Sequence, residues 1–556
     1  MLAMVEIFCK NNNTSKKFKA GFTLLDIVEE FNLDIKRPIC ALVNNKVEGL
    51  SYTVFKNKDV EFLDLHSSDA LRAYSRALFF VLNKAVLDLF HKGSTEMANP
   101  VSKGIYCPIH IGKKISETDV KLIKERMTEI IDAKMPFVRH KCHTSKAIEI
   151  FSSAGRQDAV NLLKSTGQIY SNYYTLGDLA DYFFGCMPPD TGYLTLFDIE
   201  LCEEGVLMRV PDKNNPDRLD DKVKQVKMFE VFREHHSWQK ILGISTVGDF
   251  NTACKNGATT ALINVAEALQ TKKIVHIADT ILSKHQSGTN IKIILISGPS
   301  SSGKTTFSKR LQIQLMANGL TPKVISLDNY FVEREQTPKD SDGNWDYESF
   351  YALDLNLFHE QINDLLKGKS IELPTFNFAL GTKEYLGNKM TLNNNEILIM
   401  EGIHALNPLL TSNMPDNIKF LIYVSALTSI RLDNHNYIHS TDNRLLRRIL
   451  RDYKYRGYSA CQTISRWPSV RAGEDKWIFP FQENADAMFN SALLFEIALL
   501  KDLIDPILSQ VPEDQPEYSE AHRLRNFLKL FISITDRNLP PTSLLREFIG
   551  GSSFKY

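Results

Sequence analysis

The sequence lacks several features that would each indicate a class of protein. No two of its eight cysteines stand at the C-x-x-C spacing of a zinc knuckle or redox motif, so reduced structural thiols are expected. Lys plus Arg equals Asp plus Glu at 66 each, which removes any whole-chain electrostatic argument for a nucleic-acid or anionic membrane partner. The apolar run at 77–90 is broken by Lys84 and Asp88 and is too short to span a bilayer. We therefore expect no membrane association.

A targeting signal is also missing from the N-terminal segment. Residues 1–10 contain an acid within a short apolar stretch and no basic segment that leads into a longer one, so we predict a cytoplasmic protein. A chain of 556 residues is too long for one hydrophobic core, and at least two domains are expected. With 43% hydrophobic and 24% charged residues, wholesale disorder and a fibrous repeat are both excluded.

The first half of the chain mixes short strands with helices. Alternating strands around residues 4–8, 40–43 and 60–63, with a helix at 23–31, predict a small β-rich module. Apolar residues recur at helical spacing from 69 to 90 and predict an amphipathic, core-facing helix. The pattern predicts further helices at 117–131, 144–151, 219–234 and 257–283, and the segment 284–290 is the best linker candidate.

A glycine-rich loop follows directly on a buried-strand pattern. The β-branched run 291–297 precedes Gly298-Pro-Ser-Ser-Ser-Gly303-Lys304-Thr305, which matches G-x-x-x-x-G-K-[ST], and a helix is predicted over 306–318. The two glycines let successive N–H groups point at phosphate oxygens, and the helix adds its positive end. An empty strand-to-helix turn is the alternative, although it would not require the Lys-Thr pair. The predicted nucleotide-binding residues are Gly298, Ser300, Ser301, Ser302, Gly303, Lys304, Thr305 and Thr306.

Two carboxylates end predicted strands of the same domain. Asp328 follows the strand 324–327, where it is suited to accept a proton from an attacking hydroxyl, and we predict that it is the general base. Glu401 follows the strand 396–400 and, with Thr305, is predicted to hold Mg²⁺. The alternatives are a turn-forming role for Asp328 and a helix-capping role for Glu401.

Arginines gather on one predicted helix surface farther along the chain. Arg444, Arg447, Arg448 and Arg451 lie at spacings that bring them together, and Arg456 follows. Such a cluster repels itself unless an anion pairs with it, so we predict a lid that closes over ATP and stabilises the transferring phosphoryl group. The alternative is a solvated face paired with Asp442 and Asp452.

These residues resemble the uridine kinase and phosphoribulokinase branch of P-loop kinases. The resemblance is carried by 298–306, Ser326-Leu-Asp-Asn-Tyr330, Asn344-Trp-Asp346, Pro374-Thr-Phe-Asn-Phe378, Glu401-Gly-Ile403 and Arg447-Arg-Ile-Leu-Arg-Asp452. It implies a catalytic base at Asp328 and a ribose-binding carboxylate at Asp346. It also implies catalytic or substrate-binding roles for Lys304, Arg447, Arg451 and Arg456.

The upstream half resembles long bacterial-type nucleoside kinases with an N-terminal part similar to threonyl-tRNA synthetase. The implied fold is a multidomain α/β and α+β chain, in which a P-loop domain with a parallel sheet flanked by helices follows a β-grasp-like and an α+β domain. Tyr74 and Leu78 stand where the synthetase editing domain has histidines, and no His follows Cys186, so editing chemistry is not expected. The implied divisions are 1–66 (TGS-like), 67–220 (synthetase-like), 221–290 (helical connector), 291–512 (P-loop kinase) and 513–556 (C-terminal helical extension).

The predicted activity is ATP- and Mg²⁺-dependent phosphorylation of a nucleoside 5′-hydroxyl with a uridine- or cytidine-like acceptor. Phe376 is predicted to stack on the base, but Gly381 stands where pyrimidine-specific members have a hydrogen-bonding His, which leaves the base open. The alternatives are another alcohol acceptor, such as a sugar phosphate or a pantothenate-like molecule, and an ATP-switched RNA-associated regulator. RNA binding by the N-terminal half and homo-oligomer formation are left open.

Overall fold

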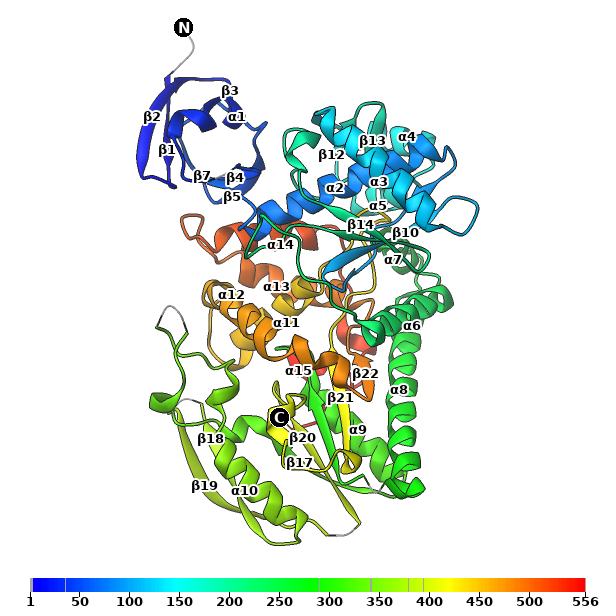
Figure 1. Cartoon of the computed structure of the whole chain (residues 1–556), viewed down its shortest axis with the longest axis vertical. Coiled ribbons are helices and arrows are strands. Elements are labelled where there is room, and N and C mark those ends of the chain that lie inside the picture. Colours follow the sequence, from blue (N-terminus) through cyan, green and yellow to red (C-terminus); the bar gives the residue numbers. More distant parts are fainter. Residues whose placement is uncertain are drawn as a thin grey trace.

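The computed structural model describes residues 4–35, 37–289, 291–340, 343–378, 380–393 and 395–555. The N-terminal module and the second region lie at one end of the molecule and the P-loop domain at the other, with the C-terminal helices between them (Figure 1). No helix in these described ranges is both long and apolar enough to cross a membrane.

The N-terminal module is a five-stranded sheet with the order β2-β1-β7-β4-β5, in which β1 and β7 pair in parallel and the other neighbours are antiparallel. Thr23 begins the helix with a capping box in which its hydroxyl and the Asp26 carboxylate each accept a backbone N–H. The elements are β1 (Met4–Cys9), β2 (Thr14–Lys19), β3 (Phe22–Thr23), α1 (Leu24–Ile27), β4 (Cys40–Val43), β5 (Lys46–Gly49), β6 (Thr53–Val54) and β7 (Lys58–Leu63).

The second region is built around α2 (Ser68–Leu89), whose residues 77–86 are all buried. The helix expected at 69–90 is present and faces the core, and over residues 77–86 it is buried on every side, as is typical of a helix central to its domain. Two sheets surround it, with the orders β14-β15-β10-β8 and β11-β12-β13. Their strands are β8 (Ser94–Thr95), β9 (Pro100–Val101), β10 (Gly104–His110), β11 (Phe137–His143), β12 (Tyr170–Leu176), β13 (Leu179–Asp181), β14 (Asp198–Cys202) and β15 (Gly205–Arg209), and the helices are α3 (Glu117–Asp132), α4 (Thr144–Ser153) and α5 (Gln157–Thr166).

Three helices, α6 (Val226–Leu242), α7 (Val247–Lys255) and α8 (Thr259–Lys284), lead to the P-loop domain. The helix expected from residue 219 begins only at Val226. The expected linker is also different, because Lys284 still belongs to α8 and a π-helical turn continues it over His285–Thr289, while Asn290 lies outside the described residues. Ile274, Ile277 and Ala278 of α8 pack in the same core as the sheet of the P-loop domain.

The P-loop domain has a fully parallel sheet with the order β17-β20-β16-β21-β22. Side chains of β16 alternate between the two faces of the sheet. Ile293 and Leu295 lie in the core that contains α10 (Leu355–Leu366). Ile294 and Ile296 lie in the core that contains α8 and α9 (Lys304–Ala317). The chain crosses to both sides of β16, so the carboxyl end of this strand is a topological switch point, where open α/β sheets bind ligands. The strands are β16 (Ile293–Ser297), β17 (Thr321–Ser326), β20 (Glu396–Glu401), β21 (Lys419–Ser425) and β22 (Ala487–Asn490).

Of the remaining elements, α10 packs on one face of this sheet and α9 on the other. A hairpin of β18 and β19 projects beside α10 (Figure 1). The elements are α9 (Lys304–Ala317), α10 (Leu355–Leu366), β18 (Ile371–Asn377), β19 (Thr382–Met390), α11 (Ser440–Tyr455), α12 (Ala460–Trp477), α13 (Glu496–Leu508), α14 (Tyr518–Leu528) and α15 (Arg546–Ile549). Short 3-10 turns cover Val28–Phe31, Thr191–Tyr193, Leu327–Tyr330, Arg334–Gln336, Phe350–Ala352, Pro408–Thr411, Asp416–Ile418, Phe479–Asn484 and Asp536–Asn538.

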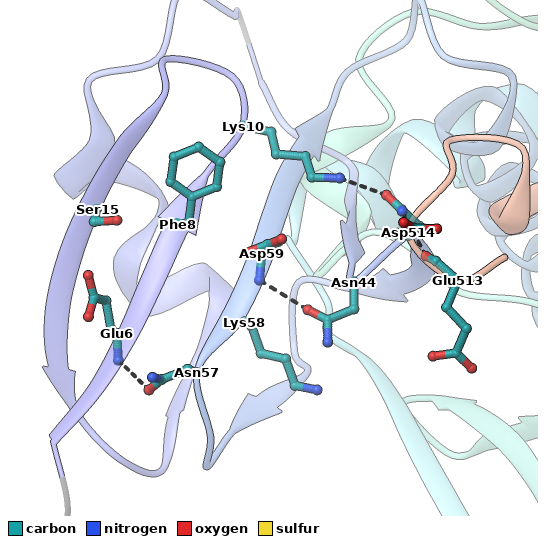
Figure 2. Close-up of a pocket in the computed structure, with 11 residues that line it drawn as sticks. Glu6, Phe8, Lys10, Ser15, Asn44, Asn57, Lys58, Asp59, Glu513 and Asp514 are labelled. Atoms are coloured by element: carbon teal, nitrogen blue, oxygen red, sulfur yellow. Dashed lines mark hydrogen bonds between the residues drawn. The ribbon is translucent and has the colours of Figure 1, made fainter.

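The C-terminal residues reach back to the N-terminal module. A pocket of 530 Å³ between them is lined by side chains of both signs, including Lys10, Asp59 and Glu513 (Figure 2). Lys10 Nζ donates to Asn45 Oδ1 at 2.8 Å, and Asn45 Nδ2 donates to the Glu513 backbone oxygen at 3.0 Å. The segment after 512 therefore contacts the N-terminal module near its start, at Glu513 and Asp514.

Candidate active site

The loop 298–305 turns between β16 and α9 in a way that only small residues allow. A Cβ on Gly298 would lie 1.9 Å from the Val424 backbone oxygen, and Gly303 has φ +82°. Ser301 also has a left-handed φ of +58°, which is uncommon for a residue other than glycine. The backbone is therefore held in a compact turn at the topological switch point.

The loop also holds polar groups that the protein itself leaves unused. The buried Ser301 and Ser302 hydroxyls have no hydrogen-bond partner in the described part of the chain. Lys304 Nζ donates to the backbone oxygens of Gly298 at 2.9 Å and Pro299 at 3.2 Å, and burial lowers its pKa. A loop with orphaned hydroxyls, a buried cation and a helix N-terminus fits a chain of phosphates.

Asp328 stands at the carboxyl end of β17, in the turn 327–330. Ser326 caps this turn, because its hydroxyl accepts the Asp328 backbone N–H at 3.4 Å. The carboxylate is open to solvent, yet desolvation by the surrounding protein still raises its pKa. The charge of Lys304 opposes this shift most strongly, and Arg451 and Arg456 act in the same direction. Asp328 is thus a solvent-exposed carboxylate whose charge interacts with three cationic side chains.

Glu401 ends β20 directly beside the end of β17, with Ser326 as its register partner. Ser326 Oγ donates to Glu401 Oε1 at 3.2 Å. Burial first, and then the charge of Asp328, raise the pKa of Glu401 to about 7. A carboxylate held at such a pKa gains from a cation, so Glu401 suits Mg²⁺, and the Thr305 hydroxyl in the first turn of α9 is a second oxygen donor of the kind that Mg²⁺ takes. The described residues hold no ready-made group of three or more acidic, His or Cys ligands, which Mg²⁺ does not need because it keeps waters and substrate phosphates.

The arginines of α11 separate into two sets. Arg448, Arg451 and Arg456 lie within 3.2 to 3.4 Å of one carboxylate, that of Asp452, which leaves an excess of positive charge. Arg448 also donates to Ser300 Oγ at 2.8 Å. The alternative prediction is a helix face whose arginines pair with Asp442 and Asp452. The structure agrees with it in part, because Asp452 pairs with three of the arginines.

Arg447 and Arg444 form the second set and point into the protein. Arg447 is fully buried, pairs with Glu496, and donates to the Ser301 backbone oxygen at 3.3 Å. Arg444 pairs with the buried Glu474 and donates to the Ser300 backbone oxygen at 3.1 Å. The structure does not bring Arg447 to the same surface as Asp328.

The predicted acceptor residues lie on two segments. Asp346 Oδ1 accepts the Glu348 backbone N–H at 3.1 Å in the loop before α10. Phe376 is only 7% exposed and packs edge-on against Phe378, with ring centres 5.1 Å apart. Phe378 is 60% exposed, so it is the more accessible aromatic surface of the pair. Gly381 has φ +76°, and a Cβ there would meet the Arg334 guanidinium.

A family model described as the phosphoribulokinase/uridine kinase family matches residues 293–497. The chain is 31% identical over 195 residues to a protein named uridine kinase from Staphylococcus aureus (strain JH9), which covers 35% of this chain and 84% of that protein. The same figures apply to the uridine kinase of strain Newman. The chain belongs to the phosphoribulokinase/uridine kinase family.

Two solved structures also match the chain. A possible uridine kinase from Bacillus stearothermophilus is 20% identical and aligns over 39% of this chain and 98% of its own, with a TM-score of 0.28. D-glycerate 3-kinase from Cryptococcus neoformans var. grubii is 14% identical and aligns over 47% of this chain and 88% of its own, with a TM-score of 0.22.

Membership of the phosphoribulokinase/uridine kinase family makes the chain an ATP-dependent kinase with a C-terminal P-loop domain. Members of the family use ATP and Mg²⁺ in general. This use agrees with the ammonium group of Lys304, which suits phosphates, and with the carboxylate of Glu401, which suits a metal ion. The matched segment begins at the first residue of β16 and ends in α13. The match therefore leaves residues 1–292 and 498–556 without an assignment.

Sequence reasoning missed three carboxylates that the fold brings to the phosphoribulokinase/uridine kinase site. Glu348 lies near Lys304 and Asp328, and burial raises its pKa to about 7. Glu474 accepts the Ser300 N–H at 3.0 Å, and Glu547 contacts the first turn of α9. Glu348 stands two residues after Asp346, which could have drawn attention to it. The other two come from distant helices, and no local signal predicts their contacts.

Proposed function

We propose that this kinase transfers the γ-phosphoryl group of ATP to the 5′-hydroxyl of a ribonucleoside. The observation that carries the proposal is the position of Asp328 at the carboxyl end of β17, next to the end of β20, where the charges of Lys304, Arg456 and Arg451 act on its carboxylate. The uridine kinases among the relatives support a nucleoside acceptor.

Asp328 acts as the general base in the proposed reaction. It takes the proton of the acceptor hydroxyl while that oxygen forms a bond to the γ-phosphorus and the bond from phosphorus to the ADP oxygen breaks. Its raised pKa brings a carboxylate closer to the value that proton transfer near neutral pH requires. Mg²⁺ held by Thr305 and Glu401 would supply positive charge to the phosphates when bound.

Cations of the chain stabilise the charge that develops on the transferring group. Lys304 leaves its contacts with the loop carbonyls to bind the β- and γ-phosphates, and Arg451 and Arg456, whose charges also act on Asp328, add positive charge to the site. Arg447 is proposed to act through the loop, because it is buried and holds the Ser301 carbonyl in place. Its earlier assignment as a direct substrate ligand stays a prediction.

The acceptor is held by the segment around Asp346 and by the β18–β19 hairpin. Asp346 binds the ribose hydroxyls in this proposal, and the aromatic pair of Phe376 and Phe378 covers the base. No histidine stands at position 381 to select a pyrimidine, so we expect a broad preference among bases.

The domain divisions remain proposals. We propose a TGS-like module at 1–66, supported by its mixed five-stranded sheet, and a synthetase-like region at 67–220, followed by the connector, the kinase domain and the C-terminal extension. Tyr74 donates to the Leu196 backbone oxygen at 2.8 Å, which supports a structural role where the editing domain would bind metal. RNA binding, homo-oligomer formation and a cytoplasmic location stay predictions.

A panel of acceptors tests the proposed function. ATP consumption is measured with four ribonucleosides, a pentose phosphate, pantothenate and glycerate, using Asp328→Asn as the control for background hydrolysis. We expect kcat/KM for the best ribonucleoside to exceed that of every other acceptor by about tenfold or more, since the ribose and base contacts are lost with the others. A higher kcat/KM with the pentose phosphate, pantothenate or glycerate would reject the nucleoside assignment and retain the kinase.

A further inference from the structure

A carboxylate from the C-terminal end of the chain sits on the P-loop helix. Thr306 Oγ1 donates to Glu547 Oε2 at 2.6 Å, and the Thr306 backbone N–H points at the same oxygen at 3.4 Å. Glu547 belongs to α15, which lies 241 residues farther along the chain. This contact is not implied by any sequence motif around either residue.

The Thr306 N–H belongs to the set of donors that a P-loop offers to phosphate. It is the third residue of α9, and the first N–H groups of a helix have no partner within the helix. Together with the helix dipole, these groups make an anion site, which in this fold receives phosphate oxygens. Glu547 thus supplies an anion of the protein itself at a place where a phosphate of ATP binds.

Packing fixes the backbone of α15, so the Glu547 side chain is the part that can move away from Thr306. Leu544, Leu545 and Phe548 are fully buried, and Phe548 lies under the Arg447 guanidinium at 5.1 Å. Lys454 Nζ donates to the Ile549 backbone oxygen at 2.9 Å and fixes the helix to α11. A rotation of one long side chain is a smaller change than a displacement of this segment.

We propose that Glu547 determines the affinity of the kinase for ATP by competing with a phosphate oxygen for Thr306. A carboxylate and a phosphate on the same N–H repel each other, so ATP binds only when the Glu547 side chain has moved away. The charge of Glu547 already reaches the reaction site, since it opposes the lowering of the Lys304 pKa by burial and adds to burial and Asp328 in raising the pKa of Glu401. The inference depends on ATP use by the family, and is independent of the acceptor.

Calorimetric titration without an acceptor tests this inference. Dissociation constants of Mg-ATP and of magnesium tripolyphosphate are measured for the wild type, Glu547→Gln and Asp514→Asn. The amide of Gln still accepts the Thr306 hydroxyl but carries no charge, so Glu547→Gln should bind both ligands about tenfold more tightly. Asp514→Asn removes the same charge from the pocket beside the N-terminal module and should leave both constants unchanged.

The two ligands separate the competing explanations. Unchanged or weaker binding of Mg-ATP by Glu547→Gln would overturn the inference, and weaker ATP binding with unchanged tripolyphosphate binding would identify Glu547 as a ligand of the nucleoside part instead. If Glu547→Gln fails to fold, Glu547→Asp retains the charge but shortens its reach to Thr306, and should also tighten binding. Tight Mg-ATP binding with no transfer to any nucleoside would reject the proposed function and leave this inference standing.

Discussion

Two clusters of charged side chains in this protein differ in how completely they are paired. The interface cluster consists of Arg156, Asp158, Asp181, Asp433 and His435, where the loop 431–436 of the kinase domain enters the second region. Arg156 reaches Asp158 at 2.8 Å and Asp433 at 3.5 Å, and also pairs with Asp181. His435 contacts Asp181 at 2.5 Å and the Thr95 backbone oxygen at 3.1 Å. The charged side chains of the interface cluster therefore pair with one another.

The P-loop cluster consists of Lys304, Asp328, Glu401, Arg451 and Arg456. Within the described residues, no direct ion pair joins Lys304 to either carboxylate, and the pKa values of both acids are raised. The orphaned hydroxyls of the loop lie beside them. Charges that the protein pairs internally stabilise its fold, whereas carboxylates at adjacent strand ends with no ion-pair partner in the described chain, such as Asp328 and Glu401, are suited to a ligand. The contrast separates the self-paired interface cluster from the P-loop cluster, for which we propose a catalytic role.

The largest effect on stability is expected from breaking the interface cluster. Arg156→Met removes the cation and leaves three buried carboxylates with one histidine, which should lower the free energy of unfolding by about 3–5 kcal/mol. Scanning calorimetry of the transition that includes the second region measures the loss.

Arg126→Met is the matched control for Arg156→Met. Arg126 pairs with Asp88 and Glu129 on a partly exposed surface, and its removal should cost about 1 kcal/mol or less. Equal losses in the two variants would show that the interface cluster is no more important for stability than a surface pair.

The next largest effect is expected on kcat and comes from changes in the P-loop cluster. Asp328→Asn and Lys304→Ala should each lower kcat by about 100-fold, or about 2.7 kcal/mol, because one removes the base and the other the positive charge on the phosphates. Neither variant should lose melting temperature, since neither side chain has a direct ion pair in the described structure. Steady-state kinetics and calorimetry on the same preparations test both parts. Wild-type kcat in either variant would remove that residue from the mechanism.

Local sequence signals predicted the kinase half well because its site is built from strand ends. The run before Gly298, the loop itself and the acids Asp328 and Glu401 follow the chain order of one sheet edge, and each carries its own pattern. The predicted strand 396–400 and the helix after the loop lie within two residues of the observed bounds.

The partners of these residues could not be predicted in the same way. Arg447 was expected on a lid surface, but it pairs with Glu496 at the start of α13, 49 residues away. The contact between Thr306 and Glu547 and the insertion of the loop 431–436 depend equally on tertiary packing. Periodicity reports which face of an element is apolar, and it does not report which distant polar group meets it.

The smallest expected effect distinguishes two glutamates at opposite ends of β20. Burial raises the pKa of Glu401 to about 7, above its unfolded value, so its contribution to stability is complete at low pH and is lost as the pH rises through 7. Glu401→Gln removes this loss and should stabilise the protein by on the order of 2 kcal/mol at pH 8, with little change at pH 5.

Glu396 at the other end of β20 supplies the opposite sign. A hydrogen bond from the Asn393 backbone lowers its pKa, so its contribution is present at neutral pH and is lost as the pH falls. Glu396→Gln should therefore destabilise slightly at pH 8, where Glu401→Gln stabilises. Melting temperatures of both variants at pH 5 and pH 8, without nucleotide, make the comparison. If Glu401→Gln lowered the melting temperature at pH 8, the carboxylate would be a paired structural group, and the P-loop cluster would resemble the interface cluster.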